Sequence, residues 1–345
     1  MKNHQQSIIT NLTEITAHKH YIFCAYARNC LFLLLKALNI GHDDEVIIPG
    51  FTCQSIYQAI LDSGAIPVLV DTEVGSINIS PSEIAKAITK RTKMIYVIHA
   101  FGISAKIDAI STIAKEYSLY LVEDLSHTLH GTFNDKRLGS FGNFAILSFT
   151  KTMINYQGGA VGTNDYDIYM KMKELQHSLV TATRKRNNYF LYYLYRLLCS
   201  IWECRGSVSV LAIFKTLFRI KGKKHINNLH EVNNDFFYIR RLPLLMIDNQ
   251  LSKQLSEKYI KKRNNKYFKT VHKTSDRIQY PYLPKEQTGV MPNHICGAII
   301  NKSKIRHAFS LAIWSNTNIA NELTNSQKHY RSLRLFAKHL WRYHD

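Results

Sequence analysis

Two ionisable side chains stand at the ends of two short apolar runs, and they are the strongest chemical signal in the sequence. Residues 119–124 read LYLVED and end in two adjacent carboxylates, and residues 144–151 read FAILSFTK and end in a lysine. Such runs are typical of buried parallel strands, whose carboxyl ends meet at one edge of a sheet. We therefore expect Asp124 and Lys151 to face a common pocket. A structural ion pair between them is the alternative.

Strands and helices are expected to alternate before this stretch. Apolar runs at 21–25, 45–49, 66–70 and 93–99 predict strands, and residues 30–38, 54–63, 81–88 and 105–116 predict helices. Ser80 and Glu83 have the spacing of a capping box at the start of the third helix. This alternation predicts an α/β fold with a doubly wound, mostly parallel sheet and a site at the carboxyl ends of its strands.

An anion site is expected where the first strand meets the first helix. Residues 30–38 are apolar on all sides, which predicts a buried helix. The unpaired backbone N–H groups at its start, at Arg28 and Asn29, are then available to an anion. Thr52 precedes the next helix, where its hydroxyl can either join such a site or only cap the helix.

Composition indicates a globular protein with a strongly basic surface. The 345 residues are 46% hydrophobic and include 45 Lys and Arg against 25 Asp and Glu, a formal charge of +20. A chain of this length suits one large domain with a small appendage. The charge favours anionic partners, but the sequence has neither zinc-ligand spacing nor an RNA-binding aromatic motif, so neither a metal site nor a specific nucleic-acid module is expected.

Cysteine usage and the first residues favour the cytoplasm. The six cysteines are scattered without a C-x-x-C pair, and residues 1–7 are polar. Free thiols are typical of a reducing compartment, and a secretory signal begins differently. We expect a cytoplasmic protein, with contact to the inner face of an anionic membrane as a further possibility.

The second half of the chain differs in texture. Residues 165–178 predict a helix, 251–271 a charged and exposed helix, 294–300 a strand and 304–313 a helix. Residues 189–220 are rich in Leu, Tyr and Phe between basic flanks, which favours helices packed on the domain or a partner, with an interfacial membrane helix as the alternative. We assign 1–240 to a large domain with a basic hydrophobic helical insertion at about 180–225, and 241–345 to a small α/β domain.

Several short motifs occur in one order along residues 20–165. They are RNCL at 28–31, VIIPGFTC at 46–53, Asp71, HAFG at 99–102, EDLSH at 123–127, GS at 139–140, SFTK at 148–151 and GGAV at 158–161. The series resembles the DegT/DnrJ/StrS-type sugar aminotransferases, which are pyridoxal-phosphate enzymes of fold type I, the aspartate aminotransferase fold. The resemblance implies a large domain with a mostly parallel sheet covered by helices, and a small α/β C-terminal domain.

The resemblance implies a role for each matching residue. Lys151 corresponds to the lysine that holds pyridoxal phosphate as a Schiff base, and Asp124 to the carboxylate beside its pyridine nitrogen. His127 corresponds to the Gln or His near the ring and its phenolic oxygen. The phosphate group would be bound by Ser148, the backbone of Arg28 and Asn29, and Thr52.

Less specific interpretations of these residues stay open. Ser148 could merely end a strand, and His127 could be a satisfied cleft histidine. His99 is expected to be structural. Cys53 stands where many relatives carry an aromatic residue over the cofactor ring.

The implied reaction is transfer of an amino group from an amino acid, with L-glutamate as the expected donor, to a nucleotide-linked keto-sugar. Cell-surface polysaccharide, O-antigen or amino-sugar biosynthesis is the implied setting, and a homodimer the implied assembly. Two alternatives remain: a catalytically idle or regulatory homologue, and a basic membrane-surface protein. Residues 184–224 are expected to face a partner or a membrane, and the alternative is that they pack on the same subunit with their charges solvated.

Overall fold

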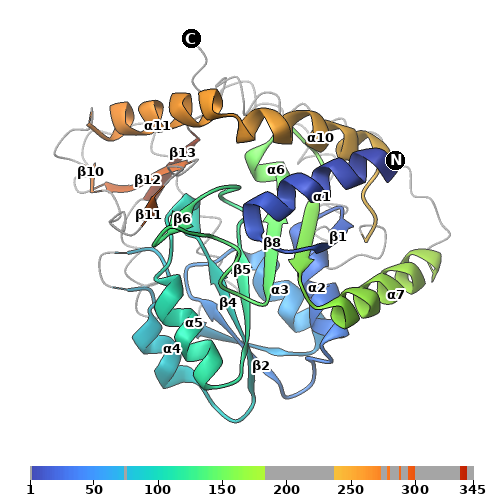
Figure 1. The fold of residues 1–345 in the computed structure, drawn as a ribbon. Coiled ribbons are helices and arrows are strands. Elements are labelled where there is room, and N and C mark those ends of the chain that lie inside the picture. Colours follow the sequence, from blue (N-terminus) through green and yellow to red (C-terminus); the bar gives the residue numbers. More distant parts are fainter. Residues whose placement is uncertain are drawn as a thin grey trace, which may run out of the picture.

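A seven-stranded sheet forms the centre of the molecule (Figure 1). The computed structural model describes residues 2–73, 76–182 and 237–272 and four short strands at 278–279, 287–288, 294–299 and 335–339. The sheet order is β1-β9-β8-β5-β4-β2-β3. Its strands are β1 (His20–Cys24), β2 (Glu45–Pro49), β3 (Ile66–Val70), β4 (Thr92–Ile98), β5 (Tyr120–Asp124), β8 (Phe144–Ser148) and β9 (Gly159–Thr163).

All strands of this sheet run in one direction except β9. Strands β8, β5, β4, β2 and β3 pair in parallel, whereas β9 is antiparallel to both β8 and β1. The first residue of β9, Gly159, is therefore the register partner of both Cys24 and Ser148, the last residues of β1 and β8. The predicted parallel, doubly wound sheet is confirmed, with one reversed strand.

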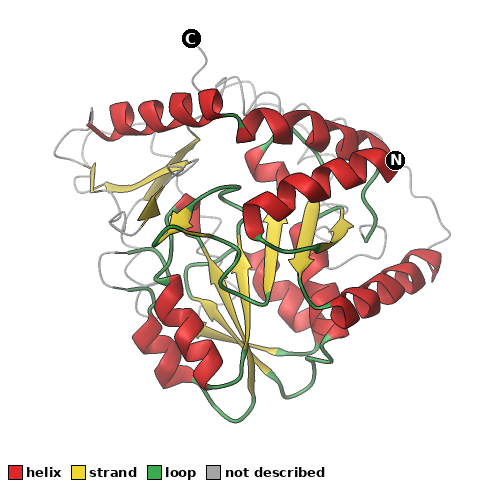
Figure 2. Cartoon of the chain, in the orientation of Figure 1, coloured by secondary structure: helices red, strands yellow, loops and turns green. Residues whose placement is uncertain are grey.

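Helices cover both faces of the sheet (Figure 2). One core cluster joins one sheet face to α2 (Ala27–Ala37), α3 (Gln54–Ser63) and α7 (Tyr166–Ala182). The other joins the opposite face to α1 (Lys2–Thr16), α4 (Pro81–Ala87), α5 (Ile107–Glu116) and α10 (Arg241–Leu255). Neighbouring strand residues such as Tyr96 and Val97 belong to different clusters, as the two-residue period of a strand requires.

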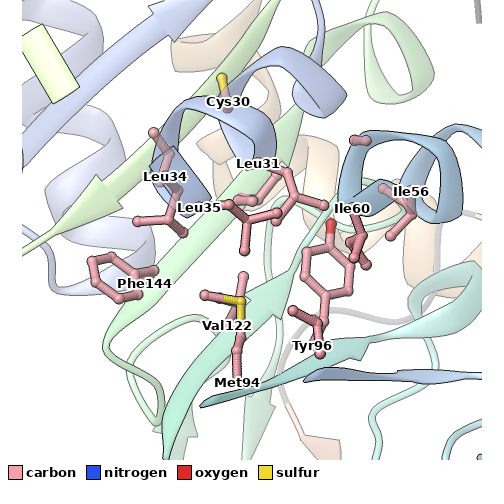
Figure 3. Packing of buried hydrophobic residues seen from close by; sticks show 14 of the residues in the cluster. Cys30, Leu31, Leu34, Leu35, Ile56, Ile60, Met94, Tyr96, Val122 and Phe144 are labelled. Carbon is pink, nitrogen blue, oxygen red and sulfur yellow. The ribbon is translucent and has the colours of Figure 1, made fainter. Parts of the chain in front are cut away.

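Helix α2 lies in the core, as its apolar sequence predicts. Leu33, Leu34 and Leu35 follow one another around the helix and are all fully buried. Figure 3 shows Leu34 and Leu35 among the other side chains of the core. Burial of each such side chain stabilises the fold by roughly 1.5 to 3 kcal/mol. The expected cap of α4 is also present, because the Ser80 hydroxyl accepts the backbone N–H of Glu83 at 3.4 Å.

The charged, exposed helix predicted at 251–271 is confirmed only from Glu257 onward, where Glu257, Lys258, Lys261 and Lys262 are exposed. Leu251 is fully buried at the end of α10, and a second helix, α11 (Glu257–His272), begins after a break at Ser256. Ser256 has an extended backbone, and its hydroxyl accepts the N–H of Tyr259 at 3.4 Å, so it ends one helix and caps the next. Helix α1 was not predicted, because residues 1–7 are polar.

Part of the second half pairs into two small sheets. The predicted strand at 294–300 is present as β12 (His294–Ile299), between β10 (Ile278–Gln279) and β13 (Leu335–His339). Strand β11 (Gln287–Thr288) pairs with β6 (Thr132–Phe133), which pairs with β7 (Lys136–Arg137). The predicted helix at 304–313 and the segments 189–220 and 184–224 lie outside the described residues.

Helix α10 packs in the same core cluster as α1. Its residues Leu244, Ile247 and Leu251 are buried in the cluster that contains α1. Asp248 also accepts a hydrogen bond from His4 of α1 at 2.6 Å. The domain boundary at 240 stays a prediction. No helix in the described part of the chain has the length and apolar character needed to cross a membrane.

Candidate active site

The strand order brings every predicted site residue to one edge of the sheet. Strands β1, β2, β5 and β8 end at this edge, and the predicted residues follow them in turn. Arg28 and Asn29 follow β1, Thr52 follows β2, Asp124 ends β5 with His127 after it, and Ser148 ends β8 with Lys151 after it. The expected clustering at the carboxyl ends is therefore present.

The two adjacent carboxylates at the end of β5 have different surroundings. Asp124 is 2% exposed, and its Oδ1 accepts the backbone N–H of Ser126 at 2.7 Å. Its Oδ2 accepts the hydroxyl of Tyr96 from β4 at 2.8 Å. Burial, and then the charge of Asp124, raise the pKa of Tyr96 well above its usual value, so Tyr96 keeps its proton and acts as the donor.

Glu123 is a structural carboxylate. It is fully buried, and its oxygens accept three backbone N–H groups, from Gly139 at 2.8 Å, Phe141 at 2.7 Å and Gly142 at 2.8 Å. The same carboxylate lies 3.2 Å from Nε2 of His99, whose Nδ1 accepts the N–H of Ala105. His99 therefore links β4 to β5, which agrees with its expected structural role.

Lys151 lies directly beside His127. Its Nζ is 3.2 Å from Nε2 of the imidazole, and the other ring nitrogen, Nδ1, accepts the backbone N–H of Phe101 at 3.0 Å. The Phe101 ring also stacks on the imidazole, with centroids 5.2 Å apart and planes 5° apart. His127 is thus held on one face and one edge, while Nε2 points to the lysine.

This geometry selects one protonation pattern. Because Nδ1 of His127 is an acceptor, a neutral ring carries its proton on Nε2 and donates it toward Lys151. Nζ of Lys151 lies 3.2 Å from this Nε2. The alternative in which Asp124 and Lys151 form an ion pair receives no support, because the salt bridges of the described residues do not include that pair.

The turn that carries Lys151 is short. Helix α6 (Phe149–Thr152) is one turn that begins directly after β8. Ser148 is 5% exposed and its hydroxyl lies 3.2 Å from that of Thr150. The N–H of Phe149 donates to the carbonyl of Gly158 at 2.9 Å, which ties this turn to the start of β9.

Strand β9 passes very close to the backbone at the start of α2. A Cβ added to Gly159 would lie 2.4 Å from the backbone nitrogen of Ala27, so only glycine allows β9 to pass there. Asn29 donates its N–H to the carbonyl of Tyr26 at 3.1 Å, and the cap residue of α2 is Tyr26. Of the two predicted backbone donors, Asn29 is therefore already used within the first turn.

Thr52 has an unused buried hydroxyl. The residue is 6% exposed, and its Oγ1 has no hydrogen-bond partner among the described residues. Helix α3 is capped by Cys53, so the capping interpretation of Thr52 is wrong. Cys53 itself is half-buried and lies 3.1 Å from the Ser55 hydroxyl.

Fold and site together define the class of protein. The large domain of fold type I, the aspartate aminotransferase fold, has this architecture. It combines the reversed strand β9, helices on both faces of the sheet, and a short turn with Lys151 at the sheet edge. The chain belongs to the DegT/DnrJ/EryC1/StrS aminotransferase family, whose sequence profile matches residues 3–197.

Relatives agree with this placement. The chain is 37% identical over 162 residues to a dTDP-3-amino-3,6-dideoxy-alpha-D-galactopyranose transaminase of Aneurinibacillus thermoaerophilus, covering 46% of this chain and 45% of the relative. It is 27% identical over 257 residues to GDP-perosamine synthase of Vibrio cholerae, covering 70% and 68%. The structure resembles that of DesV from S. venezuelae with a TM-score of 0.64 at 18% identity, over 86% of this chain and 68% of DesV.

The chain spans 45% of the length of the Aneurinibacillus relative. The described ranges contain no group of three or more His, Cys, Asp or Glu side chains that could hold a metal ion.

Two residues of the site were not predicted from the sequence. Tyr96 donates to Asp124, and Phe101 donates to His127. For Tyr96, the signal in the sequence is a single polar hydroxyl among the apolar residues of β4. The second acts through its backbone, and no side-chain pattern reports it.

Proposed function

We propose that the chain is a pyridoxal-phosphate-dependent aminotransferase that passes an amino group from an amino acid, with L-glutamate as the expected donor, to the ketone of a nucleotide-linked keto-sugar. The observation that carries this proposal is the contact of Lys151 Nζ with His127 Nε2 at 3.2 Å. It supports a lysine that is held as a nucleophile at the edge where Asp124 also ends its strand.

The residues at this edge suit the cofactor. The unpartnered hydroxyl of Thr52 and the hydroxyl of Ser148 are donors of the kind a phosphate accepts. The close approach of Gly159 to the start of α2 keeps side chains out of the space beside that helix terminus, which favours an anion. Arg28 lies in the first turn of the same helix. Lys151 would hold the cofactor covalently.

When bound, pyridoxal phosphate supplies an aldehyde that condenses with amines and a ring that accepts electrons. Lys151 would hold the cofactor through its amine, and the same nitrogen would hold or move the proton at the donor's α-carbon. His127 orients the lysine amine, and Phe101 fixes the tautomer of His127. Asp124, which accepts hydrogen bonds from Tyr96 and Ser126, would lie beside the ring nitrogen and stabilise a proton there.

The substrate class rests on the relatives and on charge. The Aneurinibacillus and Vibrio relatives are named for nucleotide-linked amino-sugars. A formal charge of +20 favours a diphosphate-linked substrate over a neutral one. We extend the proposal to amino-sugar or polysaccharide biosynthesis and to a homodimer with sites at its interface.

Borohydride reduction of the protein loaded with pyridoxal phosphate tests the cofactor assignment. We expect the reduced cofactor on the peptide that contains Lys151, and no label on that peptide in Lys151→Ala. Lys93, which lies in β4 at the opposite end of the sheet, offers a matched control, because Lys93→Ala should keep the label. Label on another lysine would overturn the assignment.

Half-reactions then test transamination. Amino acids are added one at a time to the loaded protein, and loss of the cofactor's visible absorbance reports transfer. L-Glutamate should react fastest. A loaded protein that reacts with no amino donor would instead support an idle or regulatory homologue. Vesicle flotation at low and high salt tests membrane contact separately, and failure to float at low salt would exclude it.

A further inference from the structure

The hydroxyl of Tyr96 connects the helix-covered core to the candidate site. The ring of Tyr96 is fully buried in β4 beside Leu31 of α2 and Ile60 of α3 (Figure 3). Its hydroxyl lies 2.8 Å from Oδ2 of Asp124. An ionised carboxylate can only accept, so the tyrosine is the donor.

The sheet register explains how the two side chains meet. Tyr96 is the partner of Val122 on the neighbouring parallel strand, and Asp124 lies two residues further on, on the same face. Leu31 and Ile60 fill the space around the ring, which leaves its hydroxyl directed to the carboxylate. Phenylalanine would occupy almost the same volume, so packing alone does not require the hydroxyl.

We propose that Tyr96 is a positioning residue that, together with the Ser126 N–H, holds Asp124 as an oriented carboxylate for the ring nitrogen of pyridoxal phosphate. This inference rests on the proposed function. Hydrogen bonds to the charged form of a group favour that form. Two donors on Asp124 therefore favour a proton on the ring nitrogen over a proton on the carboxyl, and a protonated ring is the better electron acceptor.

The pKa of Tyr96 supports the same role. Burial and the neighbouring charge of Asp124 raise it well above the usual value. The tyrosine consequently remains a donor throughout the range in which an aminotransferase works. No proton is transferred from Tyr96, which acts only through Asp124.

The test compares Tyr96→Phe with Tyr21→Phe. Tyr21 is also buried, at 3% exposed, and its hydroxyl bonds Thr16, away from the sheet edge, so its variant loses a buried hydroxyl of the same kind. The first measurement is carbon-13 NMR of the carboxyl groups in the cofactor-free protein, with the Asp124 signal assigned by Asp124→Asn. In Tyr96→Phe this carboxyl should take up its proton at a higher pH than in the parent, and in Tyr21→Phe it should not change.

The second measurement uses pyridoxal phosphate labelled with nitrogen-15 in the ring. The nitrogen resonance of Tyr96→Phe should move toward that of an unprotonated pyridine, and the half-reaction should slow about tenfold at saturating donor. The amino-acid concentration that gives the half-maximal rate should change little, because Tyr96 does not contact the amino acid.

The outcomes separate the two proposals. If the protein binds no pyridoxal phosphate, the proposed function fails while the carbon-13 measurement still decides whether Tyr96 controls Asp124. If the cofactor binds through Lys151 and both NMR signals in Tyr96→Phe match those in Tyr21→Phe, the positioning role is overturned and the proposed function stands.

Discussion

At the scale of single residues, one backbone contact determines what His127 can do. The Phe101 N–H occupies Nδ1 at 3.0 Å, which leaves Nε2 for Lys151. Phe101 itself has a φ of 54°, in the left-handed region that most residues avoid. A strained turn at a predicted site is the kind of outlier that points to function.

The tautomer of His127 can be measured directly. We expect Nδ1 to be unprotonated and Nε2 to carry the hydrogen in the neutral ring, because a backbone N–H already donates to Nδ1. Long-range proton–nitrogen NMR of the cofactor-free protein separates the two tautomers, with His127→Gln for assignment. His99, whose Nδ1 accepts the Ala105 N–H, should show the same tautomer and serves as an internal reference. A hydrogen on Nδ1 of His127 would contradict the proposed activation of Lys151.

Strain at position 101 can be measured by comparing two truncations. Phe101→Gly and Phe101→Ala both remove the ring, but only alanine keeps a Cβ in the left-handed conformation. The glycine variant should be the more stable by roughly 0.5 to 1 kcal/mol, after its greater freedom in the unfolded chain is allowed for. Urea unfolding at equilibrium gives the difference. An alanine variant that is equally stable would mean that the turn is not left-handed in solution.

At the scale of elements, the start of α2 is shaped by the strand beside it. Strand β9 begins with Gly159, which passes against the backbone of Tyr26 and Ala27. A reversed strand is needed for this contact, because only its first residue, and not its last, lies at the edge where α2 begins.

Gly159→Ala should therefore disturb both stability and cofactor binding. The added Cβ would lie 2.4 Å from two backbone atoms, and overpacking of this kind costs typically 1 to 3 kcal/mol. Displacement of α2 should also weaken the binding of pyridoxal phosphate, measured by equilibrium titration of its absorbance. Gly41→Ala is the control, since its nearest neighbour would be at an ordinary 3.5 Å. Equal affinity in the two variants would remove α2 from the phosphate site.

At the scale of the whole molecule, residues far apart in sequence share one core. Helix α10 packs against α1, and Glu123 gathers the loop at 139–142 under β5. His18 lies within this core at 2% exposed. Burial lowers its pKa, and the nearby charge of Glu123 offsets the effect only in part.

The free energy of unfolding should consequently depend on pH through His18. Its folded pKa lies below the ordinary 6.5, so below that pH the unfolded chain binds a proton that the folded chain does not. Stability is lost as pH falls through this window. Urea unfolding at about pH 7.5 and about pH 5.5 should show a larger loss for the parent than for His18→Gln. His42→Gln, at a side chain that is 92% exposed, should behave like the parent. Equal losses in the parent and in His18→Gln would show that His18 is not buried as a neutral ring.

The sequence by itself determined the alternation of strands and helices, the burial of α2 and the presence of polar residues at the strand ends. These features depend on hydrophobic period and on turn signals, which act over a few neighbouring residues. Helix α1 has the same kind of signal, in the spacing of the apolar residues Ile8, Leu12 and Ile15. The helix was not predicted because these residues are surrounded by polar ones.

Only the tertiary structure decided the separate surroundings of the two adjacent carboxylates. Glu123 and Asp124 point to opposite faces, and the loop at 139–142 on one face and Tyr96 on the other give them their separate roles. The contact of Phe101 with His127 and the pairing of α1 with α10 also belong to this level. Each joins groups that are distant in sequence, so its geometry depends on strand order and register, which no local pattern encodes.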